Sequence, residues 1–120
     1  MARVLVVDDC QQSAEILALM VNQLGHEATS CDAGDRALAL AAELKPDVAL
    51  IDLMMPGMDG YEVARQLKAT CGPDVRLLAV TGLPPEEWHC ERAFERYLLK
   101  PVLARDLQDA LRVVDNHAAH

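Results

Sequence analysis

Basic side chains are few in this sequence of 120 residues: 11 Lys and Arg stand against 19 Asp and Glu, so the net charge is −8. This excess of negative charge repels the phosphate backbone of nucleic acids, so we expect no binding to DNA or RNA. Long apolar runs are also missing, because the first one ends at Asp8 and a membrane helix needs roughly 20 apolar residues. No signal peptide is recognisable either. We therefore expect a cytoplasmic protein without a membrane anchor.

Cysteine is limited to four positions, and no two of them form a Cys-x-x-Cys pair. In a cytoplasmic chain, cysteines spaced this widely indicate reduced thiols rather than a set of disulfides or a zinc site. Cys10 follows directly after Asp8 and Asp9. Neighbouring carboxylates favour a raised pKa for a thiol, so we predict that Cys10 has low reactivity.

Short apolar runs rich in β-branched residues alternate with segments whose apolar residues recur at helical spacing. Apolar residues make up 52% of the chain and charged residues 25%, which is typical of a folded globular domain. Continuous apolar runs of this length indicate strands that are buried on both faces of a sheet. The predicted strands cover residues 3–7, 27–31, 47–51, 75–80 and 97–99. The predicted helices lie around 16–24, 37–44, 59–71, 86–92 and 103–114.

Five strands that alternate with five helices predict an α/β fold, in which right-handed crossover connections cover both sides of a parallel sheet. We predict a single flavodoxin-like (βα)5 domain over residues 1–120, a three-layer sandwich with the strand order 2-1-3-4-5. In that order the first and third strands are neighbours, about 4.8 Å apart. The residues that follow these two strands are therefore expected to meet at one edge of the sheet.

Charged and polar side chains come directly after four of the predicted strands. These residues, in strand order, are Asp8, Asp9, Asp52, Thr81 and Lys100. Three carboxylates placed close together repel one another, and a divalent cation that prefers oxygen ligands, such as Mg²⁺, relieves that repulsion. An ammonium group and a hydroxyl beside them suit a metal-assisted phosphoryl transfer. We predict that one of the carboxylates, Asp52, accepts the phosphoryl group.

Four motifs in this order resemble the receiver domain of bacterial two-component response regulators and hybrid histidine kinases. They are Asp8–Asp9, the segment 52–60 (DLMMPGMDG), Thr81–Gly82 and the segment 97–101 (YLLKP). Each motif lies at the carboxyl end of a predicted strand, and the resemblance extends from the first predicted strand to the last predicted helix. It implies a signalling domain in a phosphorelay, not an enzyme with a substrate of its own.

The resemblance gives Asp52 the role of phosphoacceptor, with a histidine kinase or a histidine phosphotransfer protein as the donor. It also implies Mg²⁺ as the cofactor. Asp9, Asp52 and the backbone carbonyl of Met54 correspond to the metal ligands of the family, and Asp8 corresponds to a residue that assists through a water molecule. Because the side chains of Met54 and Leu83 are both apolar, we predict slow hydrolysis of the acyl phosphate.

The remaining motif residues correspond to those that contact and sense the phosphate. Lys100 matches the lysine that contacts the acyl phosphate, and the bond before Pro101 is expected to be cis, a state accessible almost only before proline. Thr81 and Tyr97 match a switch pair that moves toward the phosphate. Their movement would reshape the surface formed by the fourth helix, the fifth strand and the fifth helix, and so control an output protein or a covalently linked effector or kinase domain.

The segment between Thr81 and Lys100 departs from the family pattern, since it is shorter by about three residues, close to one helical turn. We therefore predict a shortened fourth helix, which carries Trp88 and has a remodelled surface.

An alternative function is that of an adaptor, which uses the receiver fold to bind protein partners without phosphorylation. The full set of acidic residues, together with Thr81 and Lys100, argues against it without excluding it. A haloacid-dehalogenase-type phosphatase fits less well, because it needs a second acid two residues after the nucleophile and this chain has Met54 there. A nucleotide-binding domain would need a glycine-rich turn after the first strand, where this chain has two acids.

Overall fold

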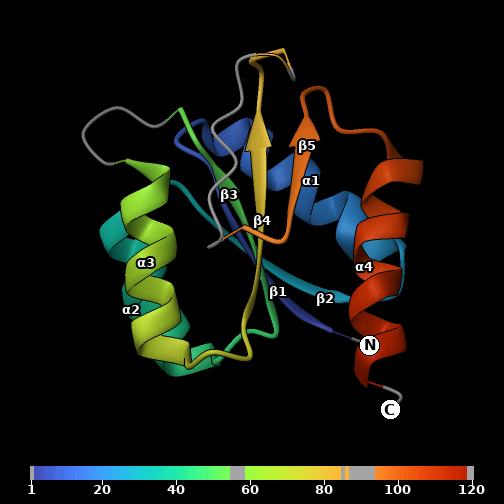
Figure 1. Cartoon of the computed structure of the whole chain (residues 1–120). Coiled ribbons are helices and arrows are strands. Elements are labelled where there is room, and N and C mark those ends of the chain that lie inside the picture. The colour runs from blue at the N-terminus through green and yellow to red at the C-terminus, as the bar shows by residue number, and fades with distance from the viewer. Residues whose placement is uncertain (1, 55–58, 85, 87–93, 119–120) are drawn as a thin grey trace.

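In the computed structural model, which describes residues 2–54, 59–84, 86 and 94–118, five parallel strands form one sheet in the order β2-β1-β3-β4-β5 (Figure 1). This confirms the predicted α/β fold and its strand order. The strands are β1 (Arg3–Val7), β2 (Glu27–Cys31), β3 (Val48–Asp52), β4 (Arg76–Thr81) and β5 (Arg96–Leu99). The helices of the described part are α1 (Gln11–Gln23), α2 (Gly34–Leu44), α3 (Gly60–Cys71) and α4 (Ala104–Ala118).

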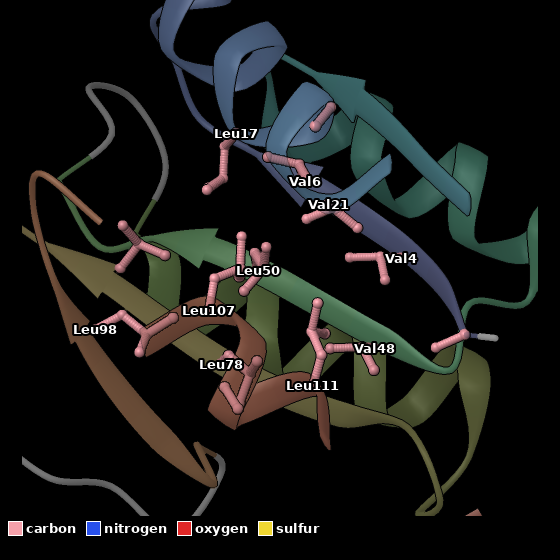
Figure 2. Packing of buried hydrophobic residues seen from close by; sticks show 14 of the residues in the cluster. Val4, Val6, Leu17, Val21, Val48, Leu50, Leu78, Leu98, Leu107 and Leu111 are labelled. Atoms are coloured by element: carbon pink, nitrogen blue, oxygen red, sulfur yellow. The ribbon is translucent and has the colours of Figure 1, made fainter. Parts of the chain in front are cut away.

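Each face of the sheet has its own hydrophobic layer. Alternate side chains of a strand point to opposite faces, so Val4 and Val6 pack with α1 and α4, whereas Leu5 packs with α2 and α3. Burial on both faces explains why the central strands β1, β3 and β4 are continuous apolar runs rather than alternating patterns. Figure 2 shows the first layer, to which the two helices contribute Leu17, Val21, Leu107 and Leu111.

Strands β3 and β4 each extend one residue further than the sequence predicts. Asp52 and Thr81 are therefore the last residues of strands, not the first residues of loops. The cause is pairing with the next strand, since Asp52 lies opposite Val80 and Thr81 lies opposite Leu99. Both polar side chains thus start from backbone that is fixed within the sheet.

Polar side chains at the amino ends of the strands pair with backbone groups. The Arg3 N–H donates to Asp47 Oδ2, and the Arg3 guanidinium donates to the Leu44 carbonyl, both at 2.9 Å. Nδ1 of His26 accepts a hydrogen bond from the Ala2 N–H, also at 2.9 Å. We call these five residues the amino edge. Their hydrogen bonds tie the starts of β1, β2 and β3 to one another and to the end of α2.

The predicted helix around residues 86–92, with Trp88, lies outside the described residues except for position 86. Its shortening therefore stays a prediction, and the label α4 denotes the last helix of the chain, which is the fifth in the sequence-based scheme. Among the described residues, no helix combines the length and the apolar character that crossing a bilayer requires.

Candidate functional site

Three carboxylates meet at the carboxyl ends of β1 and β3. Asp8 and Asp9 follow β1, Asp52 ends β3, and the two strands are hydrogen-bonded neighbours. One carboxylate oxygen from each residue lies within 4.8 Å of the other two. Asp8 and Asp52 are buried, whereas Asp9 is exposed. The structure thus brings together the three acids that the sequence places at strand ends.

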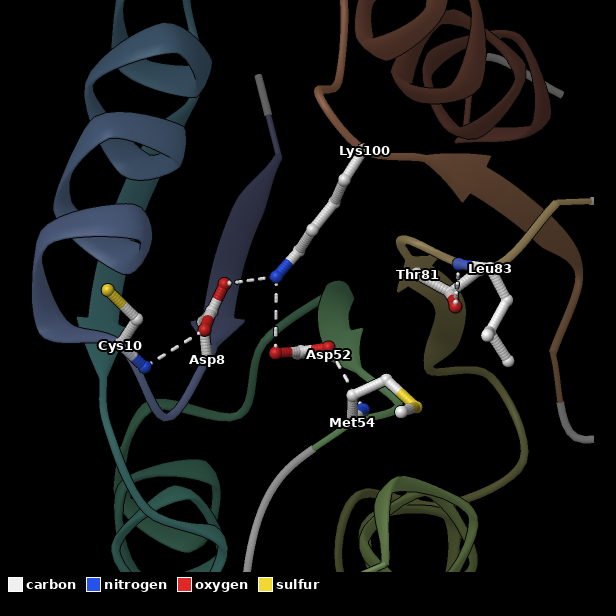
Figure 3. Close-up of polar contacts among 7 residues, drawn as sticks. All are labelled: Asp8, Cys10, Asp52, Met54, Thr81, Leu83 and Lys100. Carbon is white, nitrogen blue, oxygen red and sulfur yellow. Dashed lines mark hydrogen bonds and ion pairs between the residues drawn. The ribbon is translucent and has the colours of Figure 1, made fainter.

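Lys100 reaches into this group from the end of β5, the edge strand of the sheet. Its Nζ donates to Asp8 Oδ2 at 3.0 Å and to Asp52 Oδ2 at 3.2 Å (Figure 3). The backbone N–H of Lys100 donates to the Thr81 carbonyl at 2.8 Å, and the peptide bond between Lys100 and Pro101 is cis. One cation is therefore shared by two buried carboxylates. We call Asp8, Asp9, Asp52, Thr81 and Lys100 the carboxyl edge.

The charges at the carboxyl edge perturb one another. Burial raises the pKa of Asp52 above its ordinary value, and the charge of Asp8 adds to this, although the Met54 N–H and the Lys100 ammonium act in the opposite direction. Burial disfavours the charged form of Lys100, but its hydrogen bond to Asp8 and the charge of Asp52 outweigh burial and raise the pKa of Lys100. The lysine is thus held as a cation, while an ionised Asp52 carries a net cost.

The same local turn orients three of the side chains. In each case a side-chain oxygen at a strand end accepts a hydrogen bond from the backbone N–H two residues further on. The turn fixes the rotation of the side chain before any ligand arrives. Figure 3 shows these bonds, which join Asp8 to Cys10 at 3.0 Å, Asp52 to Met54 at 3.0 Å, and Thr81 to Leu83 at 3.1 Å.

Gly60 is a part of the site that the sequence analysis missed. Asp59 caps α3 as its type predicts, with Oδ1 accepting from the Tyr61 N–H at 2.9 Å, and this places Gly60 directly against the end of β3. A Cβ on Gly60 would lie 2.8 Å from the Asp52 carbonyl oxygen and 2.9 Å from Leu53 Cα. Only glycine allows the helix to approach the acceptor strand this closely. The Asp-Gly pair at the helix start was the available signal.

The predicted switch residues lie on the two strands farthest from β1. Thr81 is fully buried at the end of β4. Tyr97 is half-buried on β5, opposite Ala79 of β4, and packs against the layer formed by α2 and α3. Their roles in switching stay predictions, as do the individual ligand roles of Asp8, Asp9, Asp52 and the Met54 carbonyl.

The expected rise in the pKa of the Cys10 thiol was wrong, while its low reactivity stays a prediction. Cys10 is exposed at the N-terminal cap position of α1, and hydrogen bonds from the Ser13 side chain and backbone lower the pKa of its thiol. The nearby charge of Asp8 raises the pKa, as expected, but it is a smaller effect. Sequence proximity to two acids was a poor guide because the interactions with Ser13 outweigh the charge of Asp8.

The donor set of the carboxyl edge suits a hard divalent cation. All three converging side chains offer carboxylate oxygens, which Mg²⁺ prefers, and two of them are buried where uncompensated negative charge is costly. The exposed position of Asp9 leaves one side of the cluster open to water. Mg²⁺ retains several waters in protein sites, so this half-open arrangement fits the ion.

A largely apolar cavity of about 420 Å³ adjoins the carboxyl edge and was not foreseen from the sequence. It lies between α1 and the segment that follows β5, and Asp8 and Lys100 are among its lining residues. The remaining lining residues are Ser13, Ile16, Leu17, Met20, Val80, Pro101 and Val102. The cavity provides an apolar surface beside the shared lysine.

Comparison with known proteins agrees with this geometry. A family model described as the response regulator receiver domain matches residues 4–112. The DNA-binding response regulator MtrA of Mycobacterium tuberculosis is 37% identical over 111 residues, which cover 92% of this chain and 49% of MtrA. Protein PilH of Pseudomonas aeruginosa is 33% identical over 118 residues, with 95% of this chain and 98% of PilH covered. The chain thus spans about half the length of the MtrA proteins it matches and nearly all of PilH.

Solved structures agree in fold. A CheY-like response regulator receiver domain from Methylobacillus flagellatus superposes with a TM-score of 0.87 at 27% identity, covering 95% of this chain and 98% of that one. Chemotaxis protein CheY4 of Vibrio cholerae gives a TM-score of 0.83 at 26% identity, with 95% and 98% covered.

Proposed function

This chain belongs to the response regulator receiver domain family, whose members are phosphoacceptor signalling modules rather than classical enzymes, and from this premise we propose that Asp52 accepts a phosphoryl group from a histidine kinase or a histidine phosphotransfer protein. The observation that carries the proposal is the sharing of Lys100 between Asp8 and Asp52, at 3.0 and 3.2 Å, beside the exposed Asp9. Asp52 is the strand-end carboxylate that contacts both this lysine and the fixed Met54 N–H.

The proposed transfer forms one bond and breaks one. An oxygen of the Asp52 carboxylate bonds to phosphorus while the bond from phosphorus to the donor imidazole nitrogen breaks, and the electron pair of that bond stays on the donor. The Met54 N–H, 3.0 Å from Oδ1, keeps the carboxylate from rotating. The Lys100 ammonium beside Oδ2 is placed to neutralise negative charge on the phosphoryl oxygens.

Mg²⁺ is the cofactor that we propose, held by Asp9, Asp52 and the carbonyl of Met54, with Asp8 acting through a water molecule. When bound, the ion supplies positive charge that offsets the charge of the transferring phosphoryl group. The convergence of three carboxylates within 4.8 Å and the raised pKa of Asp52 support this assignment, because each indicates a need for positive charge at this point.

The cavity beside Lys100 is the side from which we expect the donor to approach. Ile16, on the cavity wall, and Leu103, just beyond it, have exposed fractions of 55% and 51%, so apolar surface continues outward from the cavity. A donor that carries its histidine on an apolar helix would bury this surface while it brings phosphorus to Asp52.

Phosphorylation adds negative charge at the end of β3, next to Thr81 on β4. We propose that Thr81 and Tyr97 respond and that the surface around β5 then controls an output protein or a linked domain in the cytoplasm. Met54 and Leu83 flank this position with apolar side chains, and their effect would be a long-lived acyl phosphate. Receiver-fold adaptors that act without phosphorylation remain the competing function.

The test is the intact mass of the protein after incubation with a small acyl phosphate donor, with and without Mg²⁺. We expect the mass of one phosphoryl group to be gained only when Mg²⁺ is present, and not by Asp52→Asn. Asp47→Asn, at the amino edge, is the matched control and should gain the group like the wild type. Labelling of Asp52→Asn would show that another residue is the acceptor. If neither the donor nor a panel of phosphorylated histidine kinases labels the wild type, the adaptor function is favoured.

A further inference from the structure

Aromatic residues are rare in this chain, yet three of the four lie in one row. The sequence has one Trp, two Tyr and one Phe. The ring of Phe94 contacts Tyr61 on one side and Tyr97 on the other, with ring centroids 5.6 Å apart in both pairs. The interplanar angles are 74° and 69°, so both contacts are edge-to-face, an arrangement that favours one mutual orientation of the rings.

The row begins next to the proposed phosphoacceptor. Tyr61 is the second residue of α3, and Gly60 before it lies against the backbone of Asp52. The Tyr61 N–H donates to the capping Asp59, so the tyrosine backbone is fixed at a helix start that lies against the end of β3. A change at Asp52 that moves the end of β3 therefore reaches the Tyr61 ring through contacts between backbone atoms.

The row ends at the predicted switch aromatic. Phe94 is 6% exposed and lies just before β5, on which Tyr97 sits. All three rings belong to the layer that α2 and α3 form on the sheet. Tyr61 and Tyr97 are half-buried, whereas Phe94 between them is enclosed.

We infer that Tyr61 and Phe94 are positioning residues for Tyr97, forming a second connection between Asp52 and the switch that does not pass through Thr81. This inference rests on the proposed function for the existence of the switch. Two edge-to-face contacts on one enclosed ring cannot both persist if Tyr97 reorients alone, because tightly packed rings shift together or lose contact. Rotation of Tyr97 that preserves this packing thus requires Phe94 to shift, and the shift reaches Tyr61. In the resting state the same contacts hold Tyr97 in one orientation.

The presence of only two tyrosines makes the inference directly measurable. Incorporation of fluorotyrosine gives one ¹⁹F resonance for Tyr61 and one for Tyr97, assigned with Tyr61→Leu and Tyr97→Leu. On phosphorylation of the wild type we expect both resonances to shift by more than a line width, with the same time course. In Phe94→Leu the two responses should separate. Tyr61 should still shift, because its helix contacts the backbone of Asp52, and the shift of Tyr97 should be reduced to the part that reaches it through Thr81. Leu19→Ala, at an exposed site on α1, is the control and should behave like the wild type.

A shift of Tyr97 without a shift of Tyr61 in the phosphorylated wild type would overturn the inference and leave the proposed function intact. The absence of a shift in both, in protein whose mass shows phosphorylation, would also overturn it. If the mass shows no phosphorylation, the proposed function fails. The inference is then tested on the unphosphorylated wild type and variants. Tyr61→Leu should then still move the Tyr97 resonance, and Phe94→Leu should remove that dependence. A Tyr97 resonance that is unaffected by Tyr61→Leu would overturn the coupling itself.

Discussion

The amino edge and the carboxyl edge of the sheet use polar side chains in opposite ways. At the amino edge, Asp47 and His26 each accept a hydrogen bond from a backbone N–H, and the Arg3 guanidinium donates to a carbonyl. At the carboxyl edge, two buried carboxylates share Lys100 and a third, Asp9, lies within 4.8 Å. The polar side chains of the amino edge form hydrogen bonds with neutral backbone groups, which stabilises the fold. The carboxyl edge concentrates like charges that folding alone does not require.

The raised pKa of Asp52 shows that negative charge at the carboxyl edge is costly. Burial raises it despite the adjacent lysine, so the ionised carboxylate is less stable in the folded chain than in water. The stabilising contribution of such a group is complete below its ordinary pKa and is lost as the pH rises through its raised pKa in the folded chain. At neutral pH the ionised Asp52 therefore lowers the stability of the folded chain, and a bound cation or a covalent modification of the carboxylate can change this effect. Structural and functional polar groups are thus separated by the length of a strand.

The largest effect is expected at Gly60, where the fold and the site meet. Gly60→Ala introduces a methyl group against the backbone of Asp52, and crowding of this kind costs about 1–3 kcal/mol. The displaced strand end should also slow phosphorylation. Urea unfolding and the labelling rate measure the two effects. Gly82→Ala, at the same edge but with nothing within 4 Å of the new Cβ, should change neither, and equal losses in both variants would contradict the role of close approach.

Addition of Mg²⁺ should stabilise the protein through the carboxyl edge. At an ion concentration about ten times the Kd, binding to the folded state alone adds about 1.4 kcal/mol. Thermal unfolding with and without Mg²⁺ measures this gain. Asp9→Asn should reduce it, because the variant lacks one of the three converging carboxylates, while Asp35→Asn on α2 should leave it unchanged. A gain of the same size in all three proteins would place the ion elsewhere.

Neutralising one acid at each edge should give stability changes of opposite sign. Asp52→Asn removes an ionised group whose pKa is raised in the fold, while Lys100 keeps Asp8 as a partner, so at pH 7 we expect the free energy of unfolding to rise. Asp47→Ala removes the acceptor of the Arg3 N–H and should lose about 1 kcal/mol. Chemical denaturation at pH 7 compares them. A loss of stability in Asp52→Asn would mean that its attraction to Lys100 outweighs burial.

The smallest effect concerns Cys31, which ends β2 at the carboxyl side of the sheet. Burial raises the pKa of its thiol from 9.0 to about 11. Its stabilising contribution is therefore complete below pH 9 and is lost as the pH rises toward 11, with about 0.8 kcal/mol lost between pH 8 and pH 9.5. The difference in unfolding free energy between the wild type and Cys31→Ala isolates this group from other titrations. A difference that stays constant over this range would show that the thiol is not protected.

The sequence predicts the sheet and its strand ends well, because both depend on local patterns. Apolar β-branched runs indicate buried strands, and the parallel order then places Asp8, Asp52 and Lys100 at one edge without further information. Contacts between distant segments are different. The approach of Gly60 to Asp52 and the contact of Tyr61 with Phe94 depend on how α3 packs on the sheet. The Asp-Gly pair marks the start of the helix, but no local pattern specifies this packing.

Cys10 shows a second kind of limit. Charge is visible in a sequence, and the effect of Asp8 on the thiol pKa was predicted in the correct direction. The larger effect comes from hydrogen bonds with Ser13, whose direction is set by the backbone at the start of α1. Such short-range geometry decides the pKa of an exposed group, and it has to be observed.

The two hydrophobic layers also have a consequence for folding during synthesis on the ribosome. The layer of α2 and α3 is built mainly from the middle of the chain, whereas the other layer joins α1, near the start, to α4, near the end (Figure 1). Chains emerge from the N-terminus, so Leu50 and Leu78 stay uncovered on one face until Leu107 and Leu111 have been synthesised. This face of the nascent sheet thus stays only partly covered, by α1 alone, until the last helix has been made.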